Sequence, residues 1–308
     1  MIPKIIFIVP YKNRVEHKYF FSQYLTHILK EKNHEIYFSN QLEEKPFNRG
    51  ASKNIGFLAC KQKYPQDYEN ITFVFHDIDT IPFQKIFDYE TKEGIVKHFY
   101  GFDYALGGIL SILGKDFEKI NGYPNYWGWG MEDNILQKRC NQFELTIDRT
   151  HFYPIGSPCI LHLFDGVSRI INKTETKKFS YDNGSDGIKS FRQLHFSIDL
   201  KSVKESDNEF HFDDPLIFIV NIKHFDIPSS SENNNFYHYD LREHPKKIMN
   251  PEEHNKLNQQ KEWTDIPPVE MKPKKFVLPK DFKTKQITKN PPRLHLPRRN
   301  RITLGGII

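Results

Sequence analysis

Cysteine is scarce in this sequence, and no long apolar run is present. The 308 residues include three Cys, at positions 60, 140 and 159. An odd and sparse set does not build the disulfide framework of a small secreted domain, and it fits a reducing compartment. No apolar run reaches the roughly 18–20 residues of a membrane-spanning helix, and the first residues lack the features of a signal peptide. We therefore expect a cytoplasmic protein without a membrane span.

Apolar and aromatic residues are plentiful enough for a folded core. Hydrophobic residues make up 38% of the chain and aromatic residues 14%, with 26 Phe and 15 Tyr. This composition excludes a wholly disordered chain. The length suits one α/β domain of roughly 200–250 residues with an additional segment.

The additional segment is expected at the end of the chain. After about residue 222 the sequence becomes rich in Ser and Asn and then in Pro and Lys, and the basic residues behind the net charge of +5 crowd into 272–301. We predict a domain at 1–222 and a basic, Pro-rich extension at 223–308. From composition, this extension is either a solvated, partly disordered tail or a surface for nucleic acid, acidic glycans or a membrane. No specific nucleic-acid partner is expected.

Apolar runs alternate with helical patterns along the first part of the domain. This alternation is typical of an α/β sheet whose central strands are covered on both faces. The predicted strands are 5–9, 35–39, 71–75 and 216–220, and the predicted helices are 20–29, 51–64 and 131–141.

Two aspartates follow the third predicted strand. Asp77 and Asp79 are separated by one residue, directly after the strand at 71–75. In α/β sheets, ligands bind at the carboxyl ends of strands. Carboxylate oxygens suit Mg²⁺ or Mn²⁺, and such an ion neutralises a diphosphate leaving group. Taken alone, the pattern is also typical of a turn in which Asp caps the backbone.

A segment rich in Gly and Trp precedes the predicted helix at 131–141. Trp127 and Trp129 are separated by one glycine and offer flat apolar surfaces to the apolar face of a sugar ring. Glu132 and Asp133 follow at the expected helix start, where a carboxylate can accept the proton of an attacking hydroxyl. The alternative is a core Trp pair followed by an ordinary acid at a helix N-terminus.

Further positions carry side chains that bind metal or phosphate. His162 comes three residues after Cys159, so the two are candidate metal ligands alongside Asp79. Arg14 and Arg49 each follow a predicted strand or turn, where a guanidinium can hold a phosphate or a base. The alternatives are a structural histidine and ordinary surface arginines.

Taken together and in this order, these segments resemble the β-1,4-galactosyltransferase family. The resemblance extends from about residue 5 to residue 222, roughly seven tenths of the chain. Its most specific part is the run from Ile120 to Gly130, Ile-Asn-Gly-Tyr-Pro-Asn-Tyr-Trp-Gly-Trp-Gly. The segments that carry it are 10–17, 47–57, 73–82, 107–108 and 120–133.

The resemblance implies a fold and a reaction. The fold is the nucleotide-sugar-binding α/β fold called GT-A, expected here with a mixed, mostly parallel central sheet and the C-terminal extension. The reaction inverts the anomeric centre and uses Mn²⁺. Asp79 and His162 match metal ligands, and Asp133, with Glu132 beside it, matches the catalytic base.

The same resemblance implies substrate-binding residues. The loop that carries Trp129 is expected to close over the donor. The donor-binding residues implied are Arg14, Phe47, Arg49, Asp77, Ala105 and Trp129. The acceptor-binding residues implied are Gly108, Gly130, Asp133 and Asn134.

Departures from the family pattern leave some properties open. Cys159 stands where Met is often the third metal ligand, so Mg²⁺ or another divalent ion is an alternative to Mn²⁺. Asn134 replaces an acid that touches the acceptor, so the acceptor is open. Ala105 stands where galactose-transferring members carry Tyr, and the extra space makes UDP-GalNAc an alternative donor to UDP-Gal. The family's Golgi anchor and disulfides have no counterpart, which suggests an intracellular setting such as that of bacteria or large viruses.

The sequence thus predicts an inverting, metal-dependent hexosyltransferase. It would move Gal or GalNAc from a UDP-sugar to a hydroxyl of a sugar or glycoconjugate acceptor. The rival hypotheses are an inactive carbohydrate-binding or scaffold module with the same fold, and a nucleic-acid-associated protein that uses the basic tail. The set formed by Asp79, Asp133 and His162 favours the enzyme.

Overall fold

The structure is a computed structural model that describes residues 2–127, 130–163, 179–200 and 214–228. The chain divides into two compact units, Met1–Glu253 and His254–Ile308, and every described residue belongs to the first. Most of the predicted C-terminal extension lies outside the described residues. Its assignment as a separate domain stays a prediction.

The described residues form helices and strands that alternate along the first third of the chain. The helices are α1 (Val15–Leu29), α2 (Arg49–Lys63), α3 (Gly114–Lys119) and α4 (Glu132–Gln142), with short 3₁₀ turns at Tyr68–Asn70 and Ile188–Ser190. The strands are β1 (Ile5–Tyr11), β2 (His34–Gln41), β3 (Thr72–His76), β4 (Thr80–Pro82), β5 (Ile95–Gly101), β6 (Ile109–Leu113), β7 (Thr146–Asp148), β8 (Tyr153–Pro154), β9 (Ile160–His162), β10 (Arg192–Asp199) and β11 (Ile217–Asp226).

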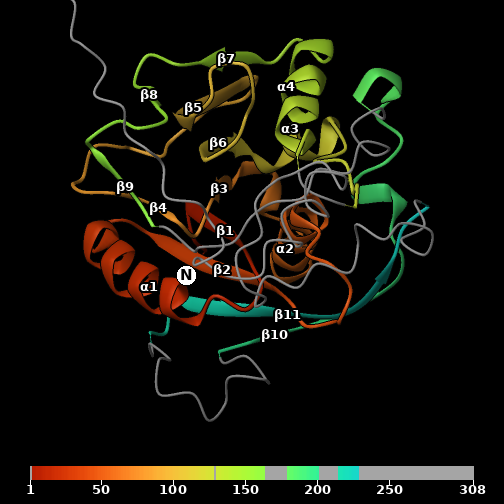
Figure 1. Cartoon of the computed structure of the whole chain (residues 1–308), viewed down its shortest axis with the longest axis horizontal. Coiled ribbons are helices and arrows are strands. Elements are labelled where there is room, and N and C mark those ends of the chain that lie inside the picture. Colours follow the sequence, from red (N-terminus) through yellow and green to blue (C-terminus); the bar gives the residue numbers. More distant parts are fainter. Residues whose placement is uncertain (1, 128–129, 164–178, 201–213, 229–308) are drawn as a thin grey trace, which may run out of the picture. The chain divides into compact units, whose positions relative to one another are not determined.

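One mixed sheet organises the described part of the chain. Its strand order is β10-β11-β2-β1-β3-β6-β5-β7, with β8 also paired to β5, and Figure 1 shows these strands stacked from bottom to top. The pairs β11–β2, β2–β1 and β1–β3 are parallel, whereas β6 runs antiparallel to both β3 and β5. This mixed, mostly parallel sheet confirms the predicted fold class.

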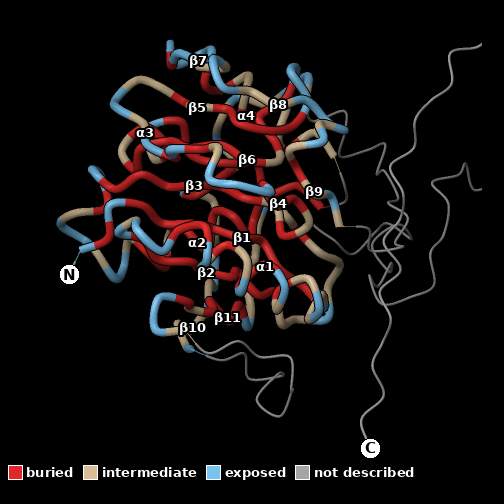
Figure 2. Tube along the Cα trace, turned by 90° about the vertical axis from the view of Figure 1, so that its left-hand side faces the viewer, coloured by how far each residue is buried: buried red, intermediate tan, exposed pale blue. Residues whose placement is uncertain are grey.

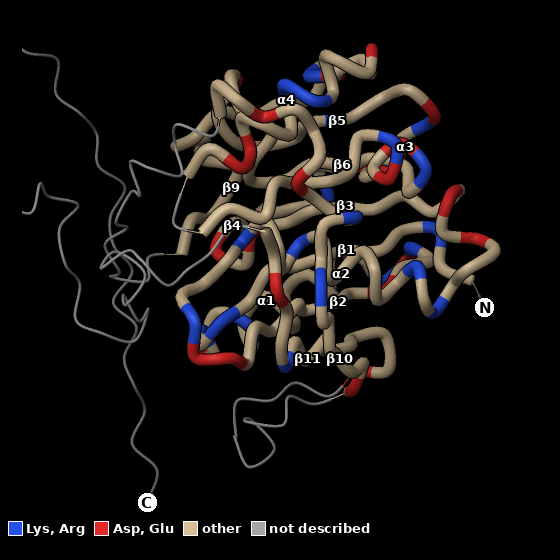
Figure 3. The backbone as a smooth tube through the Cα atoms, turned by 90° about the vertical axis from the view of Figure 1, so that its right-hand side faces the viewer, with Lys and Arg blue, Asp and Glu red and all other residues tan. Residues whose placement is uncertain are grey.

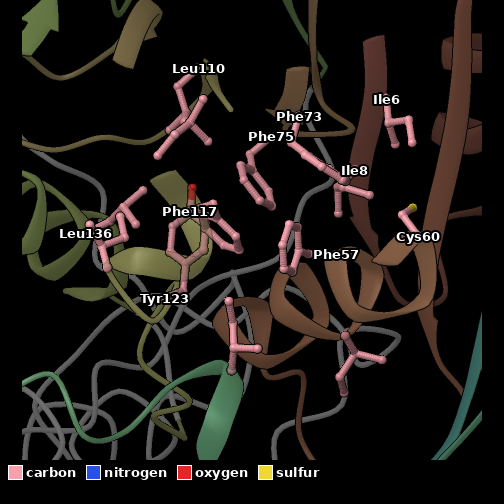
Figure 4. Packing of buried hydrophobic residues seen from close by; sticks show 14 of the residues in the cluster. Ile6, Ile8, Phe57, Cys60, Phe73, Phe75, Leu110, Phe117, Tyr123 and Leu136 are labelled. Carbon is pink, nitrogen blue, oxygen red and sulfur yellow. The ribbon is translucent and has the colours of Figure 1, made fainter. Parts of the chain in front are cut away.

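The sheet buries side chains on both faces, as the continuous apolar run of β1 predicts. Successive residues of a strand point to opposite faces. Accordingly, Ile6 and Ile8 belong to the core that includes α2, whereas Ile5 and Phe7 belong to the core that includes α1. Figure 2 shows the resulting buried centre along β1, β3 and β6. In Figure 4, Phe57 of α2 points toward the strand residues of its core.

The predicted boundaries need several corrections. β1 continues through Pro10 to Tyr11, and α2 begins at Arg49, so this arginine lies in the first helical turn and not before it. α1 begins at Val15, five residues before the predicted start. β11 runs through residue 222 to Asp226, so a boundary at 222 would cut this strand.

Basic and acidic residues are mixed in the described part of the chain, and Lys and Arg are interspersed with Asp and Glu on the side shown in Figure 3. All three cysteines are free; Cys60 and Cys140 are buried and Cys159 is partly exposed. None of the helices in the described part of the chain combines the length and apolar character needed to cross a membrane.

Candidate active site

The end of β3 and a small two-stranded sheet bring the predicted metal ligands together. β4 pairs with β9 in antiparallel fashion, with Thr80 opposite His162. The backbone N–H of Leu163 also donates to the carbonyl of Asp79 over 2.7 Å. As a result, His162 Nε2 lies 4.0 Å from Asp79 Oδ2, although more than eighty residues separate the two in sequence.

This spacing fits a divalent cation held between the two side chains. Ligand atoms sit about 2.1 Å from such an ion, so two of them on opposite sides are about 4.2 Å apart. Burial and the charge of Asp77 disfavour the ionised form of Asp79 and so raise its pKa. A cation beside Asp79 would offset both effects. The described residues contain no cluster of three or more potential ligands, so Cys159 does not join Asp79 and His162 there. Its role as third ligand stays a prediction.

Arg49 is the centre of an ion-pair network that joins three segments of the chain. Asn48 caps α2 by accepting a hydrogen bond from the Ala51 N–H over 2.9 Å, which fixes the start of this helix. Arg49 Nη2 then donates to both oxygens of Asp77, over 2.6 and 2.7 Å. Its Nη1 donates to Glu132 over 2.5 Å and to Asp133 over 2.8 Å.

The network shifts the pKa values of its members in opposite directions. Burial lowers the pKa of Arg49, but Asp133, Asp77 and Glu132 outweigh burial and raise it well above its ordinary value. Burial raises the pKa of Asp77, but Arg49 and Lys53 outweigh burial and hold this pKa at about 2. Burial and the charge of Asp133 raise the pKa of Glu132. Asp77 is therefore ionised at neutral pH.

Asp133 occupies the first turn of α4, against a glycine of the β5–β6 connection. The backbone N–H of Leu106 donates to the carbonyl of Asp133 over 3.1 Å. A Cβ added to Gly107 would lie only 2.5 Å from Asp133 Oδ2, so the absence of a side chain at this position makes room for the carboxylate. The next residue, Gly108, has a positive φ of 70° and accepts from the Asp77 N–H over 3.0 Å.

Ala105, Asn134 and Arg14 were predicted to contact the donor or the acceptor, and each lies beside a residue of the site. Ala105 is buried and lies two residues from Gly107. Asn134 Nδ2 donates to the carbonyl of Tyr104 over 3.3 Å. Arg14 Nη1 donates to Asp79 Oδ2 over 3.2 Å.

Phe47, Gly130 and Trp129 are the remaining residues that were predicted to bind the donor or the acceptor. Phe47 is half-buried, just before the capping residue of α2. A Cβ added to Gly130 would meet open space, and this glycine has a φ of 105°. Trp129 lies outside the described residues.

The prediction that Trp127 forms a sugar-binding surface is wrong. Only 2% of this residue is exposed, and its ring stacks on Phe225 of β11 with a centroid distance of 5.6 Å and an interplanar angle of 12°. Its indole therefore belongs to the core. The spacing of the two tryptophans did not reveal this, because either ring of the motif can face the interior.

Sequence reasoning missed a buried lysine and an exposed aromatic pair. Lys53, one helical turn after Arg49, places Nζ 3.3 Å from Asp133 Oδ1. Its four-residue spacing from Arg49 was the available signal, because residues at i and i+4 share a helix face. Phe102 and Tyr104 are exposed, and their rings stack with centroids 5.1 Å apart, close to Asn134.

Two family models match consecutive parts of the chain. The N-terminal region of glycosyl transferase group 7 matches residues 2–92, and the N-terminal domain of galactosyltransferase matches residues 96–159. Together they match half of the 308 residues.

Individual relatives agree with these models. β-1,4-galactosyltransferase 1 of Mus musculus is 34% identical over 207 residues, which are 61% of this chain and 49% of that protein. Xylosylprotein 4-β-galactosyltransferase of Caenorhabditis elegans is 27% identical over 221 residues, which are 65% of this chain and 73% of that protein. The chain thus spans about half the length of the mouse relative.

A solved structure supports the fold. A mutant of Drosophila β-1,4-galactosyltransferase 7, in complex with manganese, UDP-Gal and xylobiose, superposes with a TM-score of 0.56 at 20% identity. The match covers 74% of this chain and 96% of that chain. The family models and the relatives agree, and the chain belongs to glycosyl transferase group 7, together with the β-1,4-galactosyltransferases.

Proposed function

We propose that the chain is a metal-dependent, inverting glycosyltransferase that moves Gal or GalNAc from a UDP-sugar to a hydroxyl of a sugar acceptor. The observation that carries this proposal is the network in which Arg49 links Asp77, at the end of β3, to Glu132 and Asp133, at the start of α4. The names of the mouse and nematode relatives and the UDP-Gal and manganese of the Drosophila structure support it.

The side chains proposed to bind the donor suit a nucleotide and its phosphates. Asp77 is an ionised carboxylate and suits the hydroxyls of a ribose, and the guanidinium groups of Arg14 and Arg49 suit a base or phosphate oxygens. Phe47 and Trp129 supply aromatic surface for the nucleotide and the sugar. These roles place the donor over the end of β3, where α/β sheets bind ligands.

Asp79 and His162 would hold the divalent ion; Cys159 would complete the set only if it moved toward them. When bound, Mn²⁺ or another divalent ion stabilises the negative charge that develops on the departing diphosphate. A single displacement at the anomeric carbon then needs a base on the opposite face of the sugar, and that displacement inverts the configuration.

Asp133 is the proposed base. Its carboxylate accepts the proton of the acceptor hydroxyl as the new glycosidic bond forms. Glu132 lies beside it as a second carboxylate that is paired with Arg49. Gly107 leaves the room that the carboxylate needs. The exposed stack of Phe102 and Tyr104 offers an apolar surface for the acceptor ring, next to Asn134, and Gly130 has open space where a Cβ would be.

The test is a screen of UDP-sugars against simple sugar acceptors, with products read by mass. We expect UDP release and a transfer product with Mn²⁺ and UDP-Gal or UDP-GalNAc, and loss of both when EDTA removes the ion. Calcium is a suitable control, because its larger radius demands longer ligand distances. If no donor is turned over with any divalent ion while sugar binding persists, the chain is an inactive carbohydrate-binding module instead.

Ala105 is expected to set the choice between the two donors. Changing Ala105 to Tyr fills the space near C2 of the donor sugar, so we expect the kcat/KM ratio of UDP-GalNAc to UDP-Gal to fall by about tenfold or more, since steric rejection of one group is worth about 1–3 kcal/mol. Ala105→Ser, which stays small, serves as the control and should keep the wild-type ratio. An unchanged ratio in the Tyr variant would place the acetamido group elsewhere.

A further inference from the structure

Lys53 is a buried cation to which the proposed reaction assigns no role. It lies on α2, one turn after Arg49 and on the same face of the helix. Only 1% of its side chain is exposed, whereas 17% of the Arg49 side chain is exposed. A buried ammonium group is costly unless it is paired, so its partners indicate why this position carries a lysine.

The partners of Lys53 are the two carboxylates on either side of the site. Its Nζ lies 3.3 Å from Asp133 Oδ1 and 3.9 Å from Asp77 Oδ1. The same atom lies 4.4 Å above the ring centroid of Tyr123, whose negative face favours a cation. The Asp133 contact is the shortest of these, so Lys53 acts mainly on the proposed base.

The two oxygens of Asp133 are held by different cations. Oδ1 is bonded to Lys53, and Oδ2 is bonded to Arg49 and faces Gly107. Arg49 also binds both oxygens of Asp77 and so belongs to the proposed donor site. Lys53, by contrast, is almost completely buried.

We propose that Lys53 is a positioning residue: through Oδ1 it holds the Asp133 carboxylate in the orientation in which Oδ2 takes the proton, on the lone pair that Arg49 does not use. In the step itself, the acceptor O–H bond breaks and its proton goes to Oδ2. The bond between the anomeric carbon and the acceptor oxygen forms as the bond from that carbon to the diphosphate oxygen breaks, and UDP leaves with the electron pair of that second bond. Lys53 keeps its own protons throughout. This inference rests on the proposed function.

The test separates kcat from donor affinity. Lys53→Met should lower kcat by about 10- to 100-fold while the Kd of UDP, measured by calorimetry with Mn²⁺, changes less than about threefold, because a positioned base contributes up to about 10²–10⁴-fold. Lys61→Met, on the same helix and paired with Glu118 away from the site, is the control and should leave both values within about twofold. Lys53→Gln, whose amide can still donate to Oδ1, should recover part of kcat.

Each other outcome has a definite meaning. If the wild type shows no turnover, the proposed function fails before Lys53 is tested. If the wild type is active and Lys53→Met matches it in kcat, or loses UDP affinity as much as kcat, the positioning role is overturned.

A stability cycle tests the contact without any assay of activity. The unfolding midpoints of Lys53→Met, Asp133→Asn and the double variant are compared. We expect the double variant to lose less than the two single losses added together, because removing both partners leaves no unpaired buried charge. Additive losses would show that the two side chains do not act on each other and would overturn the inference. If Lys53→Met does not fold, the Gln variant enters the same cycle.

Discussion

Changing Asp133 to Asn is expected to lower the rate of sugar transfer by about 10²–10⁴-fold, the usual contribution of a positioned general base. Asn has nearly the size of Asp, so it should still fit against Gly107 at the start of α4. Its amide, however, cannot accept the proton of the acceptor hydroxyl. Donor binding should survive, because Arg49 keeps its three hydrogen bonds to Asp77.

The measurement is kcat at saturating donor and acceptor, together with the Kd of UDP in the presence of Mn²⁺. Asp88→Asn is a matched control, because this exposed carboxylate pairs with Lys97 near the start of β5 and should not affect the rate. An Asp133→Asn variant with wild-type kcat would exclude this residue as the base. A variant that loses UDP affinity instead would assign Asp133 to the donor site.

Changing Arg49 to Met is expected to lower the free energy of unfolding by about 3 kcal/mol, because removing one member of a buried ion pair leaves uncompensated charge. Arg49 contacts three carboxylates, and 17% of its side chain is exposed. Without it, Lys53 remains as the cation that contacts Asp77 and Asp133. Sugar transfer should be lost as well, since the residue links the donor site to the base.

Urea unfolding in metal-free buffer measures this effect. Arg192→Met is the control, because this arginine is exposed on β10, and its loss should change stability by less than about 0.5 kcal/mol. The double change Arg49→Met with Asp77→Asn should be less unstable than Arg49→Met alone, because one of the unpaired carboxylates is gone. Equal stability of the Arg49 and Arg192 variants would show that the network contributes little to folding.

The central strands β1 and β3 could be predicted because each contains an uninterrupted apolar run. Both strands are covered on both faces, so burial leaves a continuous apolar run that is visible in the sequence alone. β5 and β10 were missed for the opposite reason. β10 is partly exposed at the edge of the sheet, and Lys97 and His98 interrupt the apolar residues of β5. Such strands form because neighbouring strands offer hydrogen bonds, which their own residues do not reveal.

The contrast between Trp127 and Lys53 shows the limit of local patterns at the site. A tryptophan beside glycines was predicted to lie at the surface, but Phe225, far along the chain, offers it a stacking partner in the core. Lysines are rarely buried unless they are paired, and here Asp133 and Tyr123 offer Lys53 a buried position. Both outcomes depend on partners that are distant in sequence.

By itself, the sequence determined the sheet-forming runs, the order of the motifs and the chemical types at Asp77, Asp79, Asp133 and His162. These properties are local, because apolar periodicity and side-chain chemistry are carried by neighbouring residues. Only the tertiary structure decided that β9 pairs with β4 and brings His162 within 4.0 Å of Asp79. It also decided that Arg49 and Lys53 share the two oxygens of Asp133. Contacts of this kind arise when segments from different parts of the chain are packed together, and their distances are set by the sheet and helices between them.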